Sequence, residues 1–202
     1  VVSSIFDPLG FLAPLILPAK QLLQELCQRG YGWDEPLPEP VSERWMEWTN
    51  SLERIKGFSV PRCLKPKGYG VTNCAELHHF ADASESGYGS VSYIRQLNNQ
   101  DVIHVNFVLG KSRVLPLKNI TVPRLELAAA ALLVKVDRMV RRELHLNLKP
   151  SFFWTDSQTV LKYIANDHAR YKTYVANRVS LIRDNTDLSQ WRHVRSKDNH
   201  VK

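Results

Sequence analysis

The sequence predicts an α/β protein with one mixed sheet flanked by helices, in the element order β-β-β-α-β-α-α-β, preceded by a helical connection segment. Two observations carry this prediction. Apolar residues recur at helical spacing within residues 1–57, whereas three strand-like runs follow one another after residue 75. A long helix-like run and a short apolar run come next, and this alternation is typical of helices packed on a sheet.

Residues 1–57 contain two helical patterns. "PAKQLLQELCQRG" places leucines at helical spacing, and its Gly30 suits a helix C-cap. "VSERWMEWTNSLERIKG" forms a stripe at steps of four and three that ends at Gly57: Val41, Trp45, Trp48, Leu52 and Ile55. The following residues, 58–75, are rich in proline, glycine and lysine and predict a linker.

Residues 76–202 supply the predicted sheet domain. "AELHHFAD", "GYGSVSYIRQL" and "DVIHVNFVLG" read as three strands of an antiparallel meander. "VPRLELAAAALLVKVDRMVRREL" follows as a long helix with Pro123 in its first turn, where proline is tolerated. "SFFWTD" predicts a fourth strand, two helices follow, the first with Ser157 as N-cap, and "LSQWRHV" predicts a closing strand.

The charge of the chain is unevenly distributed. The formal net charge is +7, yet residues 1–60 hold 5 Lys/Arg against 8 Asp/Glu, and residues 61–202 hold 22 against 12. This basic excess favours a polyanionic partner such as nucleic acid, and the alternative is a solvated basic surface without a partner. No pattern in the sequence predicts an oligomeric state.

Three features predict a protein of a reducing, intracellular compartment without a membrane partner. The cysteines Cys27, Cys63 and Cys74 are too few and too scattered for a disulfide framework. "FLAPLILPAKQLL" is interrupted by prolines and falls short of the ~20 residues that span a bilayer, and no basic region precedes it as in a signal peptide.

The start at "VVSSIFDPLG", without an initiator Met, predicts a fragment of a longer protein.

Three carboxylates occupy comparable places in the predicted fold. Asp82 ends the first strand, Asp156 ends the fourth, and Glu126 lies in the first turn of the long helix. If the first and fourth strands are neighbours, their carboxyl ends bring Asp82 and Asp156 together, with Glu126 leaning over them. Carboxylates in one place repel unless cations neutralise them, and oxygen-only ligands suit Mg²⁺ or Mn²⁺. Two such ions about 4 Å apart activate a water and stabilise the leaving oxygen of a phosphodiester.

Each carboxylate also has a purely structural interpretation. Asp82 fits an Asx turn before "ASESG", Glu126 is a favourable charge near a helix N-terminus, and Asp156 precedes the Ser157 cap. Singly, each residue favours its structural interpretation. Taken together on this order of elements, the three favour a metal site.

The motifs around these residues resemble a known family. "FADASESGYG", "KSRVLPLKNITVPRLELAAA", "FFWTDSQTVLKYI" and "WRHVRSKDN" are similar to the ribonuclease H domain of BEL/Pao LTR retrotransposon polyproteins. "SSIFDPLGFLAPLILPAKQLLQELCQRGYGWDEPLP" resembles the end of the preceding reverse transcriptase region. The resemblance implies a ribonuclease H fold that binds two Mg²⁺ or Mn²⁺ ions and cuts the RNA strand of RNA–DNA hybrids. It implies that Asp82 bridges both ions and that Glu126 and Asp156 hold the second.

The end of the sequence departs from the family pattern. The resemblance implies a fourth carboxylate on a last helix, and Lys202 stands at its position, so the domain is expected to lack that ligand and helix. Asp198 is a candidate substitute. Loss of this ligand predicts a weakened or inactive enzyme. The alternatives are a nucleic-acid-binding remnant without catalysis, or a structural connection piece of a Pol polyprotein. No Tyr-x-Asp-Asp motif occurs, which excludes a polymerase active site.

A nuclease that tolerates many sequences contacts phosphates and 2′-hydroxyls rather than base edges. The predicted contact residues flank the three carboxylates or follow the third strand: Ser84, Ser86, Lys111, Arg113, Arg124, Ser157 and Gln158. His193 in "WRHV" is a further candidate near the site. The alternatives are capping for the serines and glutamine, exposed loop charges for Lys111 and Arg113, and a structural strand-end role for His193. Phosphate contacts would make binding strongly salt-dependent.

Overall fold

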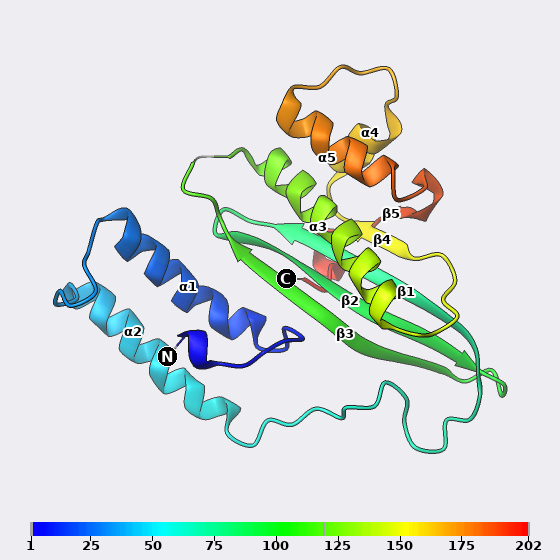
Figure 1. The fold of residues 1–202 in the computed structure, drawn as a ribbon, viewed down its shortest axis with the longest axis horizontal. Coiled ribbons are helices and arrows are strands. Elements are labelled where there is room, and N and C mark those ends of the chain that lie inside the picture. The colour runs from blue at the N-terminus through cyan, green and yellow to red at the C-terminus, as the bar shows by residue number, and fades with distance from the viewer. Residues whose placement is uncertain (1, 119, 202) are drawn as a thin grey trace.

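Five strands of the described chain form one sheet in the order β3-β2-β1-β4-β5 (Figure 1). The computed structural model describes residues 2–118 and 120–201. Its strands are β1 (Thr72–Ala83), β2 (Gly87–Asn98), β3 (Ile103–Val114), β4 (Phe152–Thr155) and β5 (Trp191–His193). Its α-helices are α1 (Ala13–Gln28), α2 (Glu39–Ser51), α3 (Val122–Glu143), α4 (Gln158–Ala165) and α5 (Thr173–Arg183). Short 3-10 helices are η1 (Val2–Ser4), η2 (Leu52–Ile55), η3 (Leu188–Gln190) and η4 (Ser196–Asp198).

The element order confirms the predicted β-β-β-α-β-α-α-β arrangement. β1 pairs antiparallel with β2, and β2 pairs antiparallel with β3, which is the predicted meander. β4 then pairs parallel with the other edge of β1, with Ala81 opposite Thr155, and β5 pairs parallel with β4. The carboxyl ends of β1 and β4 therefore lie side by side, which is the condition stated above for Asp82 and Asp156 to meet.

Helix α3 covers one face of the sheet, and α5 packs beside it (Figure 1). Leu127, Leu133 and Val134 of α3 are fully buried together with Phe153 of β4. Burying such apolar side chains stabilises the fold by roughly 1.5–3 kcal/mol each relative to exposure. Side chains alternate along a strand, so the next residues of β1 and β4 point away from α3. On that opposite face, the Phe80 ring stacks on Trp154 with centroids 5.8 Å apart.

A polar network is buried between the sheet and α3. His79 is fully buried, accepts from Ser92 Oγ at Nδ1 (2.7 Å) and donates from Nε2 to Asp137 Oδ1 (3.0 Å). Asp137 also accepts from Ser151 and from Arg141 Nε (3.1 Å). Burial lowers the pKa of His79, and the Asp137 carboxylate offsets this only in part. Burial alone raises the pKa of Asp137, but the His79 and Ser151 hydrogen bonds and the Arg141 charge together lower it.

The helices of residues 1–57 pack against the sheet rather than standing apart from it. α1 lies along β3, and α2 lies on the outer side of α1 (Figure 1). Trp48 of α2 donates its Nε1–H to the Leu15 carbonyl (2.7 Å). Before α1, the chain crosses the free edge of β3, where the Gly110 N–H donates to the Leu9 carbonyl (2.8 Å). This contact covers an otherwise exposed strand edge, which is a recurrent means of preventing strand-to-strand aggregation.

Gly10 permits this close crossing of two backbones. Its φ is +80°, and a Cβ added there would lie 1.9 Å from the Gly110 carbonyl oxygen. We expect Gly10→Ala to detach the segment from β3, so that the Gly110 amide loses its protection from hydrogen exchange. Gly30→Ala is the matched control, because Gly30 has φ +76° but nothing within 4 Å of an added Cβ. Gly30→Ala should cost only the left-handed backbone strain of roughly 1–2 kcal/mol. Equal rates of hydrogen exchange at the Gly110 amide in both variants would contradict the prediction.

Several element boundaries differ from the predictions. β1 begins at Thr72 rather than Ala75, so the end of the predicted linker 58–75 is part of a strand. The pattern that predicted a single helix from residue 41 ends as α2 at Ser51 and continues as η2. β3 extends to Val114, so Lys111 and Arg113 lie on a strand and not in a loop. Glu126 lies just beyond the first turn of α3, which holds no acidic residue. The domain division at 57 and 75 stays a prediction.

Within residues 2–118 and 120–201, no helix has the length and apolar content to cross a membrane.

Candidate active site at the carboxyl ends of β1 and β4

Two of the predicted carboxylates sit at the matched ends of parallel neighbours. Ala81 of β1 is opposite Thr155 of β4; Asp82 follows Ala81 within β1, and Asp156 is the first residue after β4. Asp82 pairs with Gly89 of β2 and is partly buried, and Asp156 is partly exposed. The parallel pairing therefore places the backbones of Asp82 and Asp156 at the same end of the sheet, where β1 and β4 finish; we call this end the carboxyl edge.

The third carboxylate reaches the same edge from α3. The Ser157 hydroxyl donates to Glu126 Oε2 (2.7 Å) and accepts from the Val160 N–H (3.1 Å). Ser157 is thus the N-cap of α4, as predicted. Because Ser157 directly follows Asp156, its hydrogen bond also places Glu126 near the end of β4. Ser157 is buried, and its hydroxyl already forms these two hydrogen bonds. This favours the capping interpretation of Ser157 over a contact with nucleic acid.

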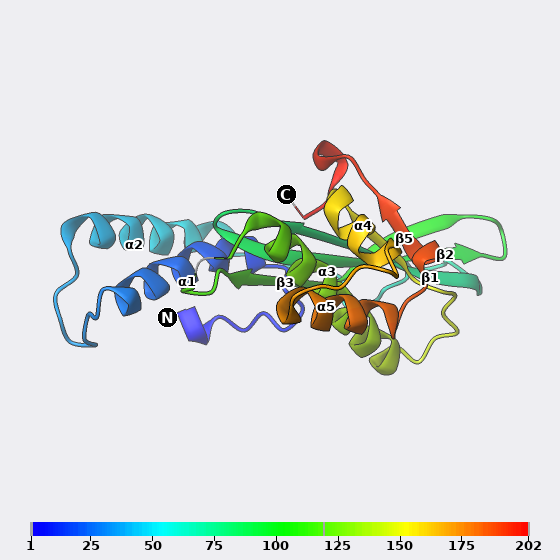
Figure 2. The same ribbon diagram turned by 90° about the horizontal axis from the view of Figure 1, so that it is seen from above.

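The last described residues cross this edge. The Ser196 hydroxyl donates to Asp156 Oδ2 (2.5 Å), and Asn199 Nδ2 donates to the Ala81 carbonyl (2.9 Å). The His200 ring then packs edge-on against Phe80, with centroids 4.8 Å apart, on the face opposite α3. Figure 2 shows this end of the chain and α5 on opposite sides of the sheet. Sequence reasoning missed Ser196 and Asn199, although both lie in the quoted motif "WRHVRSKDN".

The three carboxylates have the chemistry that hard divalent cations prefer, but their side chains do not surround a common position. Three carboxylates offer oxygen ligands only, which suits Mg²⁺ or Mn²⁺. Within residues 2–118 and 120–201, however, no three His, Cys, Asp or Glu side chains lie close enough together to hold an ion. In this arrangement serine hydroxyls bind Glu126 and Asp156. Metal binding at this end of β1 and β4 would therefore need the three carboxylates to come closer together.

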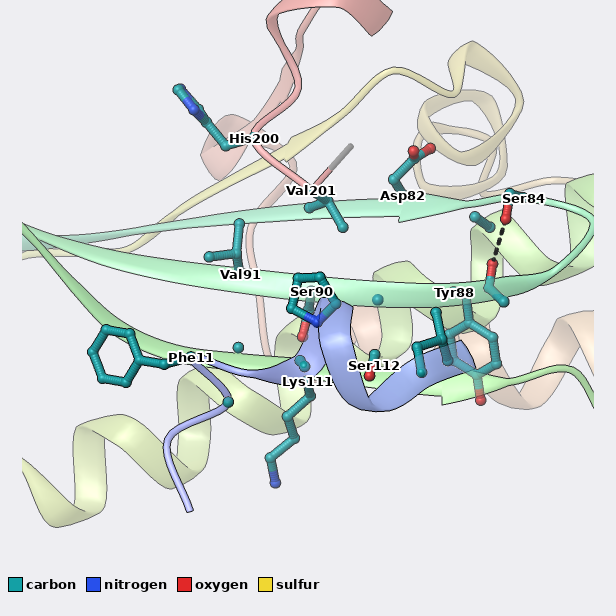
Figure 3. Close-up of a pocket in the computed structure, with 18 of the residues that line it drawn as sticks. Phe11, Asp82, Ser84, Tyr88, Ser90, Val91, Lys111, Ser112, His200 and Val201 are labelled. Carbon is teal, nitrogen blue, oxygen red and sulfur yellow. Dashed lines mark hydrogen bonds between the residues drawn. The ribbon is translucent and has the colours of Figure 1, made fainter. Parts of the chain in front are cut away.

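A pocket of about 410 Å³ adjoins Asp82. Its walls come from the segment before α1 (Phe11), from α1 (Pro14), from β2 and β3, and from the end of the chain (His200). Figure 3 shows Asp82 on the same side of the strands as His200 and Val201, whereas Lys111 extends to the opposite side. The N-terminal segment thus shapes the surroundings of Asp82, which the sequence patterns did not predict.

The predicted nucleic-acid contacts fall into two groups. Ser84 and Ser86 share a hydrogen bond (2.9 Å) in the exposed turn beside Asp82, and Gln158 is exposed at the start of α4. Lys111, Arg113 and Arg124 lie elsewhere: the first two on β3 and the last on α3, over the Tyr174 ring at 5.5 Å.

Two further candidates belong to the last part of the chain. His193 is exposed on β5 opposite Thr155, and Asp198 is exposed in η4. Lys202, which stands at the predicted position of the fourth carboxylate, lies outside the described residues.

Comparison with known proteins identifies the family. The model of the Pao retrotransposon-like RNaseH-like domain matches residues 1–157. The chain belongs to this family. The match confirms the resemblance seen in the sequence, and the five-stranded mixed sheet with flanking helices is the ribonuclease H-like fold. No curated protein matches the Pao chain.

Solved structures similar to the Pao chain are ribonucleases H and a viral reverse transcriptase. RNase H1 from Halobacterium salinarum NRC-1 is 10% identical, with 64% of this chain and 93% of that chain covered and a TM-score of 0.39. LC11-RNase H1, solved in complex with an RNA/DNA hybrid, is 8% identical, with 63% and 89% covered and a TM-score of 0.38. The prototype foamy virus protease-reverse transcriptase is 17% identical, with 79% and 25% covered and a TM-score of 0.35.

Proposed function

We propose that this Pao domain binds RNA–DNA hybrids and hydrolyses the RNA strand with Mg²⁺ or Mn²⁺. The parallel pairing of β1 with β4 is the observation that carries the proposal, because it sets Asp82 and Asp156 one residue beyond the opposed pair Ala81–Thr155. The hydrogen bond from Ser157 brings Glu126 to the same edge. Membership of a ribonuclease H-like family supports the same chemistry.

Asp82, Glu126 and Asp156 are the residues that would hold the metal. Divalent ions bound there would activate a water and stabilise the leaving oxygen of the RNA backbone. The hydroxyls of Ser157 and Ser196 bind Glu126 and Asp156, and they would compete with a metal ion for those carboxylates. We therefore expect the metal affinity to depend on both serines.

The hybrid would be held through its backbones. Ser84, Ser86 and Gln158 are exposed close to the carboxylates and suit sugar and phosphate oxygens. Arg124, Lys111 and Arg113 supply positive charge at greater distance, in agreement with the basic excess after residue 60. Contacts of this kind do not read base identity, as a nuclease acting along a whole template requires.

A second function, binding of nucleic acid without cutting, is favoured by one specific observation. The described residues hold no group of three His, Cys, Asp or Glu side chains that could hold an ion. Such a protein would keep the fold and the basic surface and act inside a Pol polyprotein, either as a binding remnant or as a connection piece. The setting proposed for both functions is the cytoplasm, within a virus-like particle.

Cutting of a labelled hybrid tests the two functions against each other. We expect the RNA strand of an RNA–DNA hybrid to be cut in Mg²⁺ or Mn²⁺, the DNA strand to stay intact, and cutting to stop when EDTA removes the metal. RNA–RNA and DNA–DNA duplexes of the same sequence are the controls for strand selection. Salt-sensitive binding of the hybrid without cutting at any metal concentration would overturn the nuclease and leave the binding protein. Failure to bind the hybrid at all would leave only the connection piece.

A further inference from the structure

A second pocket, of about 300 Å³, lies on the α3 face of the sheet. It is bounded by Ala128 and Ala131 of α3, by α5, and by the adjacent ends of β2 and β3, where Tyr88 pairs with Arg113. The Ala side chains leave a shallow floor, so that a bulky ligand can approach the helix closely. The pocket is distinct from the one beside Asp82, which lies against the segment before α1 and the end of the chain.

The pocket collects positive charge from three elements. Arg113 comes from β3, Lys135 from α3 and Arg178 from α5, and Asn177 adds an amide. None of the described residues that line it is acidic. Among the ion pairs within residues 2–118 and 120–201, none involves Arg113, Lys135 or Arg178. Like charges brought together without a counter-charge repel, so the arrangement favours an anionic ligand.

Arg178 is held in a fixed orientation. Its guanidinium carbon lies 3.5 Å from the centroid of the Tyr174 ring, and its Nη1 donates to the Tyr174 carbonyl (2.9 Å). A guanidinium fixed in this way loses little entropy when its remaining N–H groups bind, and its fork matches the oxygens of a phosphate. Arg124 lies over the same ring at 5.5 Å, and it precedes Glu126 by two residues. Two arginines, Arg124 of α3 and Arg178 of α5, therefore lie against one aromatic ring.

We propose that this groove, lined by Arg113, Lys135, Asn177 and Arg178, binds the phosphodiester backbone of the nucleic acid that the active site engages. The inference rests on the proposed function and names a contact surface for it. Phosphate oxygens accept from the two arginines and the lysine, and Asn177 donates to a phosphate or sugar oxygen. These donors suit phosphate and sugar oxygens, which are the same at every base, so the groove is expected to bind independently of sequence.

Binding of a fluorescent RNA–DNA hybrid to single variants tests the groove. We expect Arg113→Gln, Lys135→Gln and Arg178→Gln each to weaken binding roughly three- to tenfold at about 0.1 M salt, and to lower the slope of log K against log salt by about one. Arg54→Gln is the matched control, because Arg54 is an exposed cation of η2 without an ion pair among the described residues. It should leave both quantities unchanged. Thermal melting of each variant verifies that the fold is kept.

The outcomes separate the groove from the function on which it rests. If the wild-type protein does not bind the hybrid, both the function and the groove are wrong. If it binds, and the groove variants match Arg54→Gln in affinity and salt slope, only the groove is wrong. Arg178→Lys adds a test of geometry: a fixed guanidinium fork predicts weaker binding even though the charge is kept, whereas a diffuse charge effect predicts wild-type affinity.

Discussion

Asp82→Asn is expected to reduce cutting of the RNA strand at least about 100-fold, while affinity for the hybrid stays within about twofold. The change removes one negative charge and one oxygen ligand but keeps the size of the side chain. The backbone of Asp82 in β1 pairs with Gly89 of β2, and the substitution leaves this backbone pairing unchanged. The rate of cutting is measured in single-turnover assays, and affinity by fluorescence anisotropy in EDTA.

Glu85→Gln is the matched control for this prediction, because Glu85 is an exposed carboxylate in the turn that follows β1. It removes the same charge close to the site without removing a predicted ligand, and cutting should be unchanged. Titration with Mn²⁺ provides a readout that does not depend on turnover: wild-type protein should bind Mn²⁺ more tightly than Asp82→Asn. Equal Mn²⁺ affinity in both proteins, or equal cutting, would remove Asp82 from the site.

Asp137→Ala is expected to lower the free energy of unfolding by about 2–5 kcal/mol. The change leaves the buried His79 Nε2–H and the Ser151 hydroxyl without their acceptor and removes the ion pair with Arg141. Asp137→Asn should cost less, because its amide oxygen still accepts hydrogen bonds. Denaturant unfolding followed by tryptophan fluorescence measures the difference. Asp167→Ala is the control: Asp167 pairs with Arg183 while 78% exposed, and such surface pairs contribute at most about 1 kcal/mol.

The same network gives the stability a defined dependence on pH. The pKa of His79 is lower in the folded protein than its ordinary value of 6.5, so the unfolded chain binds more protons below that pH. The pKa of Asp137 is also lowered, from 3.8, and its contribution is lost as pH falls further. Both effects have the same sign, and wild-type stability should fall as pH drops below about 6.5. A stability independent of pH between 7 and 5 would contradict a buried neutral His79.

Local patterns predicted the elements of the fold well. Period-two alternation identified β1, β2 and β3, and helical periodicity identified α1, α2 and α3, because these patterns record which side of each element is buried. The boundaries were less predictable. β1 extends back to Thr72 because it pairs with the far end of β2 at Asn98, and this partner is distant in the sequence.

For the candidate site, the sequence indicated candidate residues but not the partners that they contact. Strand ends rich in small and acidic residues indicated Asp82 and Asp156, and the parallel pairing of β1 with β4 brings their backbones together. The partners of the carboxylates were not predictable. Ser196 binds Asp156 from 40 residues away, and nothing in a serine's local context indicates such a contact. The groove was missed for the same reason: Lys135 and Arg178 occupy helix surfaces where isolated charges are normally solvated.

The sequence by itself determined the class of fold, the order of its elements and the family, because these depend on residue patterns within single segments. Only the tertiary structure decided which polar groups meet. It buried His79 against Asp137, laid the Gly10 backbone across β3, and gathered Arg113, Lys135 and Arg178 in one pocket. Such contacts join residues from different elements, and their geometry is set by how the helices pack on the sheet, which no local pattern encodes.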